Sequence, residues 1–449
     1  MLLLLLRFKL VEICPCVVLE VVMKYILKNG YVYENESFHV KDILVNNGII
    51  ADISSDILAT EDVLVFDLSN KYVLPGFLDV HVHLREPGFS YKETIETGTM
   101  AAAHGGYTAV FSMPNLSPVP SNFESLFAQL RLIKEYGKVR VVPFGSITVD
   151  EKGVELADFD SMAGFVAGFS DDGRGVQSED LMNVAMIKAR KLNKIISAHC
   201  EDNSLLNGGY IHDGEYASLN GHKGICSESE WKPIERDIAL IKENKCSYHV
   251  CHISTKESVE LIRKAKAEGV DITCETAPHY LVFNDMMITE DAKFKMNPPI
   301  RSEADRLALV EGVIDGTIDM IATDHAPHSF EEKSKGLAKS LMGVVGLECA
   351  FSVMYTEFVK KGILTLEKLV DLFSINPRKR FDMKNDILIG NTIDICVFDP
   401  EIKSIVDPEK FFSKGRSTPF EGREVFGEIV LTICEGHVSY SKEKFVELI

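Results

Sequence analysis

The sequence lacks the hallmarks of several large classes of protein. Its ten cysteines are scattered from Cys14 to Cys434 without any CxxC unit, which fits free thiols in a reducing cytosol better than a disulfide framework. Basic residues are outnumbered, 48 against 67 acidic ones, and the net charge of -19 argues against nucleic acid or an anionic membrane as a partner. The chain also contains no internal repeat and no low-complexity tract.

The first 22 residues lack the layout of an export signal. Leu2–Leu6 looks like the opening of a signal peptide, but charged residues from Arg7 to Glu20 interrupt the apolar run, and no small-residue cleavage site follows. The stretch is also too short and too charged to span a membrane. We therefore expect a cytoplasmic protein in which residues 1–22 are a non-native or unstructured leader and Met23 is the true start.

Two segments at the ends of the chain have the pattern of short strands. Residues 23–75 show strand-like runs with hairpin signals at Asn29-Gly30 and Asn47-Gly48. Residues 385–449 return to the same pattern, beginning with Ile387–Leu388. We expect the two segments to form one small β-sandwich domain.

Residues 76–384 alternate between strand-like and helix-like patterns. Eight strands with intervening helices over about 250 residues are the size and rhythm of a (β/α)8 barrel. Ser121 with Glu124 predicts a capping box, and Ser178 predicts another helix start. The sequence thus predicts an α/β protein with a TIM-like barrel, whose strands are Leu78–Leu84, Tyr107–Met113, Val139–Ile147, Gly164–Ser170, Lys194–Ala198, Ser247–His252, Asp271–Glu275 and Asp319–Thr323.

Polar residues recur where these strands end, which is the face that carries the active site in such barrels. His81 and His83 are two residues apart on one strand, so both rings point to the same face. Such a pair alone is more often two half-buried structural histidines on an ordinary strand. Later strand ends add nitrogen and carboxylate ligands, enough for one or two divalent ions of the zinc type: Asp171, Asp172, His199, His252 and Asp324.

The same residues carry a resemblance to a known family. Asp79-x-His81-x-His83-x-Arg85-x-Pro87-Gly88 and Thr323-Asp324-His325-Ala326-Pro327-His328 resemble the signature pair of the class I, bacterial-type dihydroorotases of the amidohydrolase superfamily. The resemblance extends from Met23 to the C-terminus. Further matching runs are Met113-Pro114-Asn115, Ser170-Asp171-Asp172-Gly173, Ala198-His199-Cys200-Glu201-Asp202, Glu275-Thr276-Ala277-Pro278-His279-Tyr280 and Lys295-Met296-Asn297-Pro298-Pro299-Ile300-Arg301.

The resemblance implies a zinc centre with two ions per subunit, or with a single ion as the alternative. Asp172 matches the carboxylate that bridges the two ions, and Asp171 is the alternative bridge. No lysine lies between Gly164 and Asp172, so the carbamylated lysine of many hydantoinases is excluded here. The implied ligands are His81, His83 and Asp324 for the first ion and His199 and His252 for the second.

The resemblance also implies how a substrate is held. Arg85 offers a planar pair of donors for a carboxylate, a group that dihydroorotate carries and hydantoin lacks. The alternative is a structural ion pair of Arg85 with Glu86 or Glu93. The family usually has phenylalanine where this chain has Met342, which changes the pocket wall. The implied substrate contacts are His83, Arg85, Asn115, Asn297, His328 and the backbone of Met342 and Gly343.

The implied activity is the reversible cyclisation of N-carbamoyl-L-aspartate to L-dihydroorotate and water in de novo pyrimidine (UMP) biosynthesis. A metal-bound hydroxide attacks the ring carbonyl, and Asp324 is the catalytic general acid and base. The alternatives are another cyclic amidohydrolase (hydantoinase, dihydropyrimidinase or allantoinase) and a non-catalytic dihydroorotase-like partner subunit. Besides the small-molecule substrate, the family suggests two partners, a second copy of the chain and aspartate transcarbamoylase.

Overall fold

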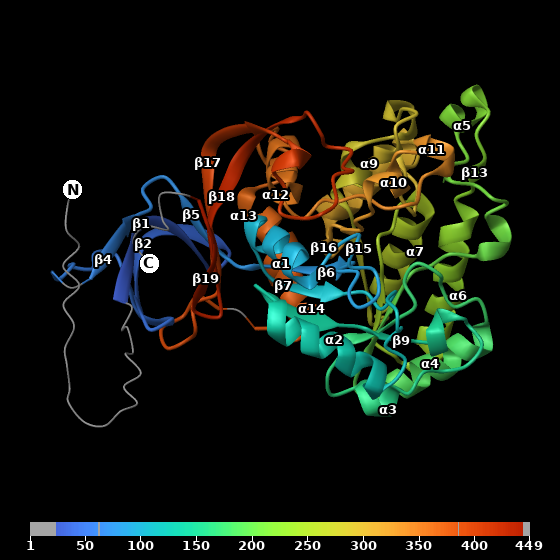
Figure 1. Cartoon of the computed structure of the whole chain (residues 1–449), viewed down its shortest axis with the longest axis horizontal. Coiled ribbons are helices and arrows are strands. Elements are labelled where there is room, and N and C mark those ends of the chain that lie inside the picture. The colour runs from blue at the N-terminus through green and yellow to red at the C-terminus, as the bar shows by residue number, and fades with distance from the viewer. Residues whose placement is uncertain (1–23, 62, 385, 443–449) are drawn as a thin grey trace.

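The computed structural model describes residues 24–61, 63–384 and 386–442. The predicted leader and the predicted start at Met23 lie outside these residues. Strands from both ends of the described chain form a sheet on one side of the molecule, and a barrel of strands and helices lies on the other (Figure 1). No helix within the described ranges is long and apolar enough to cross a membrane.

The sheet joins strands that lie far apart in the sequence. Its order is β19-β18-β17-β5-β1-β2-β3, with β4 paired to β1. Val397 of β17 lies opposite Val73 of β5 in antiparallel register, and this pairing joins the N-terminal strands to the C-terminal strands. The strands are β1 (Lys24–Glu34), β2 (Ser37–Asn46), β3 (Ile49–Ser54), β4 (Leu64–Asp67), β5 (Tyr72–Pro75), β17 (Ile395–Ile405), β18 (Glu424–Cys434) and β19 (His437–Ser441).

One of the two predicted hairpins in this sheet is confirmed. Asn47 and Gly48 join β2 to β3 with positive φ angles of 49° and 74°, as a two-residue turn of this type requires. At Asn29-Gly30 the prediction is wrong, because β1 continues through the pair with a register shift, and the buried Asp42 carboxylate accepts from the Asn29 N–H at 2.8 Å. The predicted strand Ile387–Leu388 is also absent.

All eight predicted barrel strands are present, with the third divided into β8 and β9. The strands run parallel, in the orders β6-β7-β8 and β9-β10-β11-β14-β15-β16. His83 N–H donates to the His325 carbonyl at 2.9 Å, which brings the end of the last strand beside the first. The predicted fold class is confirmed. The barrel strands are β6 (Phe77–Val82), β7 (Tyr107–Ser112), β8 (Arg140–Pro143), β9 (Gly145–Ser146), β10 (Gly168–Ser170), β11 (Ile195–Ala198), β14 (Tyr248–Val250), β15 (Ile272–Thr276) and β16 (Met320–Ile321).

Helices connect these strands. The main connecting helices are α1 (Ile95–His104), α2 (Phe123–Tyr136), α3 (Phe159–Met162), α4 (Glu179–Lys191), α6 (Glu228–Asn244), α7 (Lys256–Ala267) and α9 (Glu303–Asp315). Shorter elements in the loops and after the barrel are β12 (Ile211–His212), α5 (Glu215–Asn220), β13 (Gly224–Ile225), α8 (Pro278–Val282), α10 (Phe330–Lys333), α11 (Gly336–Lys339), α12 (Ala350–Met354), α13 (Leu366–Val370) and α14 (Asn376–Arg380).

Of the two predicted helix starts, the one at Ser178 is confirmed and the capping box at Ser121 is wrong. Ser178 caps α4, and its hydroxyl accepts from the Leu181 N–H. The capping box of α2 is formed by Asn122 and Ser125 instead of Ser121 and Glu124. Ser121 is buried, and its hydroxyl accepts from the Asp150 N–H at 3.0 Å, so a contact to the next barrel loop replaces the cap.

A buried aromatic cluster joins the barrel to the sheet. Phe77 on β6 stacks on Phe351 of α12 at 4.5 Å between ring centroids, and Phe351 meets Phe398 of β17 at 5.0 Å. Phe77 lies at the start of β6 and His81 near its end, so this shared core holds the first barrel strand at the end opposite to His81.

Candidate active site

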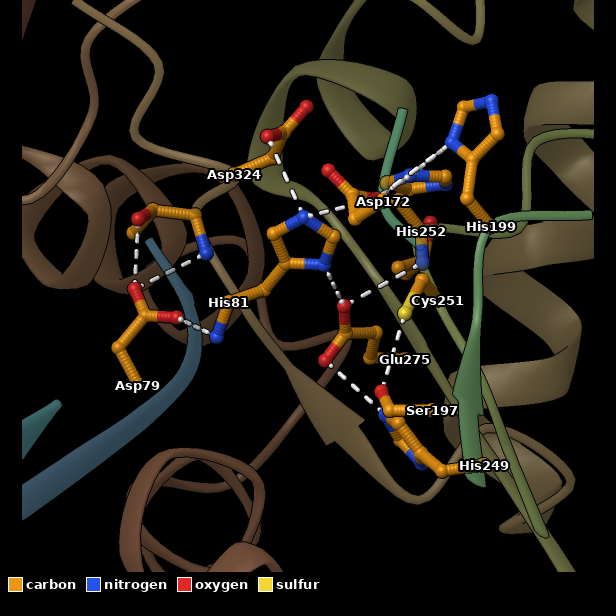
Figure 2. Close-up of polar contacts among 12 residues, drawn as sticks. Asp79, His81, Asp172, Ser197, His199, His249, Cys251, His252, Glu275 and Asp324 are labelled. Carbon is orange, nitrogen blue, oxygen red and sulfur yellow. Dashed lines mark hydrogen bonds and ion pairs between the residues drawn. The ribbon is translucent and has the colours of Figure 1, made fainter. Parts of the chain in front are cut away.

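Five barrel strands end in one buried polar cluster, shown in part in Figure 2. His81 lies on β6 and His83 just beyond it. Asp172, His199, His252 and Asp324 follow β10, β11, β14 and β16, respectively. All six side chains are buried. The structure thus brings together the six residues that the resemblance implied as metal ligands.

Asp172 lies at the centre of this cluster. Its Oδ1 is 3.2 Å from His252 Nε2, 3.3 Å from His81 Nε2 and 3.5 Å from His199 Nδ1. Its Oδ2 is 3.3 Å from His83 Nε2. One carboxylate therefore faces all four imidazoles.

Asp324 extends the cluster on the side of His83. Its Oδ1 lies 3.1 Å from His83 Nε2 and 3.6 Å from His81 Nε2. In each of two groups of residues, the possible ligand atoms all lie within 4.8 Å of one another. One group is His81, Asp172 and His252, and the other is His81, His83 and Asp324. A third such group joins His81 to Cys251 and Glu275.

Asp171 points away from the imidazoles. Its carboxylate accepts from the Ile147 N–H at 2.7 Å, from the Thr148 N–H at 3.0 Å and from the Thr148 hydroxyl. These bonds anchor the loop that follows β9. Of the two neighbouring aspartates, Asp172 is the one placed for coordination.

The outward nitrogens of His81 and His83 are held by oxygen acceptors. His81 Nδ1 lies 2.7 Å from Glu275 Oε1, and His83 Nδ1 lies 2.9 Å from Asn115 Oδ1. Since both neighbours are acceptors, each Nδ1 carries the proton and each Nε2 directs its lone pair into the cluster. A carboxylate or carbonyl behind the imidazole is the usual support of a metal-binding histidine.

The cluster fits a divalent metal because its inner atoms are electron donors that face one another. His81 Nε2 is a buried nitrogen without a hydrogen-bond partner among the described residues, and His199 Nδ1 lies only 2.9 Å from His252 Nε2. Imidazole lone pairs opposite carboxylate oxygens repel each other unless a proton or a metal cation lies between them. Four imidazoles and two carboxylates, with no need for a thiolate, are ligands that zinc and similar ions accept.

The charged side chains of the cluster shift one another's pKa values. Burial disfavours ionisation, yet the charge of His81 and the imidazoles bonded to Asp172 hold the pKa of that carboxyl well below its usual range. Burial lowers the pKa of His81, but the negative charge of Asp172 outweighs this effect. The pKa of His81 therefore lies well above its ordinary value. The pKa of Glu275 falls to about 2 despite burial, because His249 and His81 hydrogen-bond to it. A metal ion that binds here displaces protons that the carboxylates otherwise attract.

Three residues at the rim of the barrel have left-handed backbone conformations. The φ angles of Arg85, His252 and Asp324 are 63°, 33° and 47°. Residues other than glycine are uncommon in this region, and strained conformations of this kind cluster at active sites. The unusual backbone aims these side chains at the centre of the barrel mouth.

Arg85 lies beside the cluster with most of its donors unused. The residue is only 7% exposed, and Nε donates to the Pro327 carbonyl at 3.1 Å. Neither Nη atom has a hydrogen-bond partner among the described residues. The alternative ion pairs are not formed, because Glu86 accepts from the Ile95 N–H and Glu93 lies 3.5 Å from His325.

The remaining predicted substrate contacts line the same mouth but already have protein partners. Asn297 Nδ2 donates to Glu201 Oε1 at 2.9 Å, and its Oδ1 is buried and unpaired within the described structure. His328 Nε2 donates to the Met342 carbonyl at 2.7 Å. Burial and the charges of Arg85 and Lys92 lower the pKa of His328 to about 3, so its ring is neutral.

Sequence reasoning missed two carboxylates that hold the ligands in place. Glu275 supports His81 from β15, and Asp79 accepts from the His81 N–H at 3.0 Å and from the Thr323 N–H at 3.1 Å. Both residues are buried acids within matched motifs. The available signal in the sequence was an acidic residue inside a predicted apolar strand, because a carboxylate buried there needs a partner.

Comparisons with known proteins agree with this geometry. A family model described as Dihydro-orotase-like matches residues 70–258. The dihydroorotase of Fusobacterium nucleatum subsp. nucleatum is 48% identical over 425 residues, covering 94% of this chain and 100% of that protein. The dihydroorotase of Bacillus thuringiensis is 46% identical, with 94% and 99% covered.

Among solved structures, the fold is similar to that of cyclic amide hydrolases. The L-hydantoinase (dihydropyrimidinase) from Arthrobacter aurescens superposes with a TM-score of 0.82 at 27% identity, covering 94% of this chain and 96% of that one. The dihydropyrimidinase from Brevibacillus agri gives a TM-score of 0.81 at 24% identity, with 93% and 95% covered. The identity to the dihydroorotases is much higher and extends over nearly their whole length, so this chain belongs to the dihydroorotase family.

Proposed function

We propose that this chain catalyses the reversible cyclisation of N-carbamoyl-L-aspartate to L-dihydroorotate and water. The observation that carries the proposal is the buried Arg85 side chain, two residues beyond His83, whose Nη donors have no hydrogen-bond partner in the described structure. Leaving a buried cation without an acceptor is costly, and a substrate carboxylate supplies one. Dihydroorotate carries that carboxylate, whereas hydantoin and dihydropyrimidines lack it.

The cluster would hold two zinc ions bridged by Asp172, with a single ion as the alternative. His81, His83 and Asp324 would bind the first ion, and His199 and His252 the second. When bound, such an ion lowers the pKa of its water to about 7 and polarises a carbonyl.

The residues of the chain then have separate tasks. Arg85 binds the substrate carboxylate with two parallel N–H donors and so fixes which ring carbonyl faces the cluster. Asp324 takes the proton of the attacking water and delivers it to the leaving ring nitrogen, and it reverses this transfer during cyclisation. Glu275 and Asn115 keep the His81 and His83 rings oriented.

An assay on dihydroorotate, hydantoin and allantoin separates the candidate functions. We expect the zinc-loaded protein to turn over dihydroorotate much faster than the other two substrates, because only dihydroorotate offers a carboxylate to Arg85. Faster turnover of hydantoin would instead favour a general cyclic amidohydrolase. A protein that binds no zinc and hydrolyses none of the three would favour the non-catalytic subunit.

Replacing Arg85 by alanine tests the carboxylate site. Charge-assisted hydrogen bonds contribute about 1.5–3 kcal/mol each, so losing two of them should raise the KM for dihydroorotate at least about 100-fold. Steady-state kinetics and metal analysis on the same sample measure this, with the metal content expected to stay unchanged. An unaltered KM would remove Arg85 from substrate binding.

The neighbouring aspartates provide a matched pair for the metal site. Asp172→Asn should reduce the bound zinc that remains after dialysis, because the central anion among four imidazoles is lost. Asp171→Asn should keep its zinc, since Asp171 bonds to Ile147 and Thr148. Elemental analysis compares the two variants, and equal zinc content in both would contradict the assigned role of Asp172.

A further inference from the structure

A single lysine connects two walls of the proposed substrate pocket. Lys333, at the end of α10, donates from Nζ to the carbonyls of Gly343 at 2.8 Å, Lys295 at 3.1 Å and Leu341 at 3.1 Å. An ammonium group has three N–H donors, so all of them are used. None of the steps described above involves this residue.

The three acceptors belong to the segments that carry predicted substrate contacts. Lys295 lies two residues before Asn297, and Leu341 immediately precedes Met342 and Gly343. The Lys295 carbonyl also accepts from the Gly343 N–H at 3.0 Å. Lys333 therefore joins the wall that bears Asn297 to the wall that bears Met342 and Gly343.

The backbone of Gly343 lies close against the segment that follows the last barrel strand. Gly343 has a φ of +134°, and a Cβ atom there would lie 2.6 Å from the Ala326 carbonyl oxygen and 3.0 Å from His328 Cδ2. The Met342 carbonyl simultaneously accepts from His328 Nε2. A displacement of the Gly343 backbone would thus move both the backbone contact and the His328 ring.

We propose that Lys333 is a positioning residue for the substrate, which it does not touch: its ammonium holds the 341–343 backbone against the 295–297 segment and so sets the width of the pocket. The kinetic part of this proposal rests on the proposed function. Loss of the ammonium leaves three carbonyls without their shared donor, and the wall that they form loosens. The metal ligands lie on other segments, so metal binding does not depend on it.

Lys333→Met tests the proposal, with Lys339→Met as the matched control. Both changes remove one ammonium from the same stretch of chain, but Lys339 is exposed at the end of α11. We expect Lys333→Met to raise the KM for dihydroorotate at least about tenfold, with kcat within about threefold and zinc content unchanged. Lys339→Met should match the wild type. An unchanged KM in Lys333→Met, or a parallel loss of zinc and kcat, would overturn the proposal.

Hydrogen–deuterium exchange without substrate gives a readout that does not depend on turnover. We expect the amide of Gly343 and its neighbours to exchange at least about tenfold faster in Lys333→Met than in Lys339→Met. Equal exchange would overturn the positioning role even in an active enzyme. If the wild type fails to turn over dihydroorotate while exchange responds as expected, the proposed function fails and the structural role of Lys333 stands.

A second variant covers the case in which Lys333→Met does not fold. Lys333→Arg keeps the charge, but a planar guanidinium cannot direct its donors to three carbonyls around one atom. We expect it to give intermediate values of KM and of Gly343 exchange. Wild-type values for both would overturn the proposal.

Discussion

Asp172 places a carboxylate among four imidazoles where water has little access, and the arrangement of the barrel mouth depends on how that charge is balanced. Hydrogen bonds to Glu275 and Asn115 direct the lone pairs of His81 and His83 toward the same centre. A buried set of donors of this kind is stable only with a cation or with protons in the middle. The donors of this set come from the ends of five barrel strands.

The scaffold around the centre consists of buried polar bonds between distant parts of the chain. Asp79 joins the first strand to the last through Thr323, and Glu275 joins His81 to His249. The aromatic cluster around Phe77 holds the first strand from the opposite end. Ligand positions are thus fixed by partners on other strands, which limits how far any one ligand can move when a substrate or an ion binds.

Periodic features of this molecule could be predicted from the sequence alone. The eight barrel strands and the ligand residues at their ends follow from apolar runs that finish in histidine or aspartate, as at His81 and Asp324. For the two terminal segments, the sequence predicted one shared β domain, but neither the pairing of β17 with β5 nor its register. Local signals failed where a distant partner took over, as at Asn29-Gly30, where Asp42 holds a bulge, and at Ser121, whose hydroxyl accepts from Asp150.

The choice between Asp171 and Asp172 shows the same limit. Both aspartates follow the same strand, and only the bonds of Asp171 to Ile147 and Thr148 tell them apart. Lys333 had no distinguishing pattern in the sequence, because its three acceptors are backbone carbonyls up to 38 residues away. The left-handed backbone at Arg85 and His252 has no sequence signal either, since neither residue is glycine.

X-ray absorption spectroscopy of the zinc-loaded protein at the zinc edge tests the central claim most directly. Nitrogen and oxygen ligands alone, at about 2.0–2.2 Å, are predicted for ions held by these histidines and aspartates. A sulfur ligand at about 2.3 Å, such as Cys251 beside His81, would contradict this assignment of the ligands, as would zinc that fails to bind.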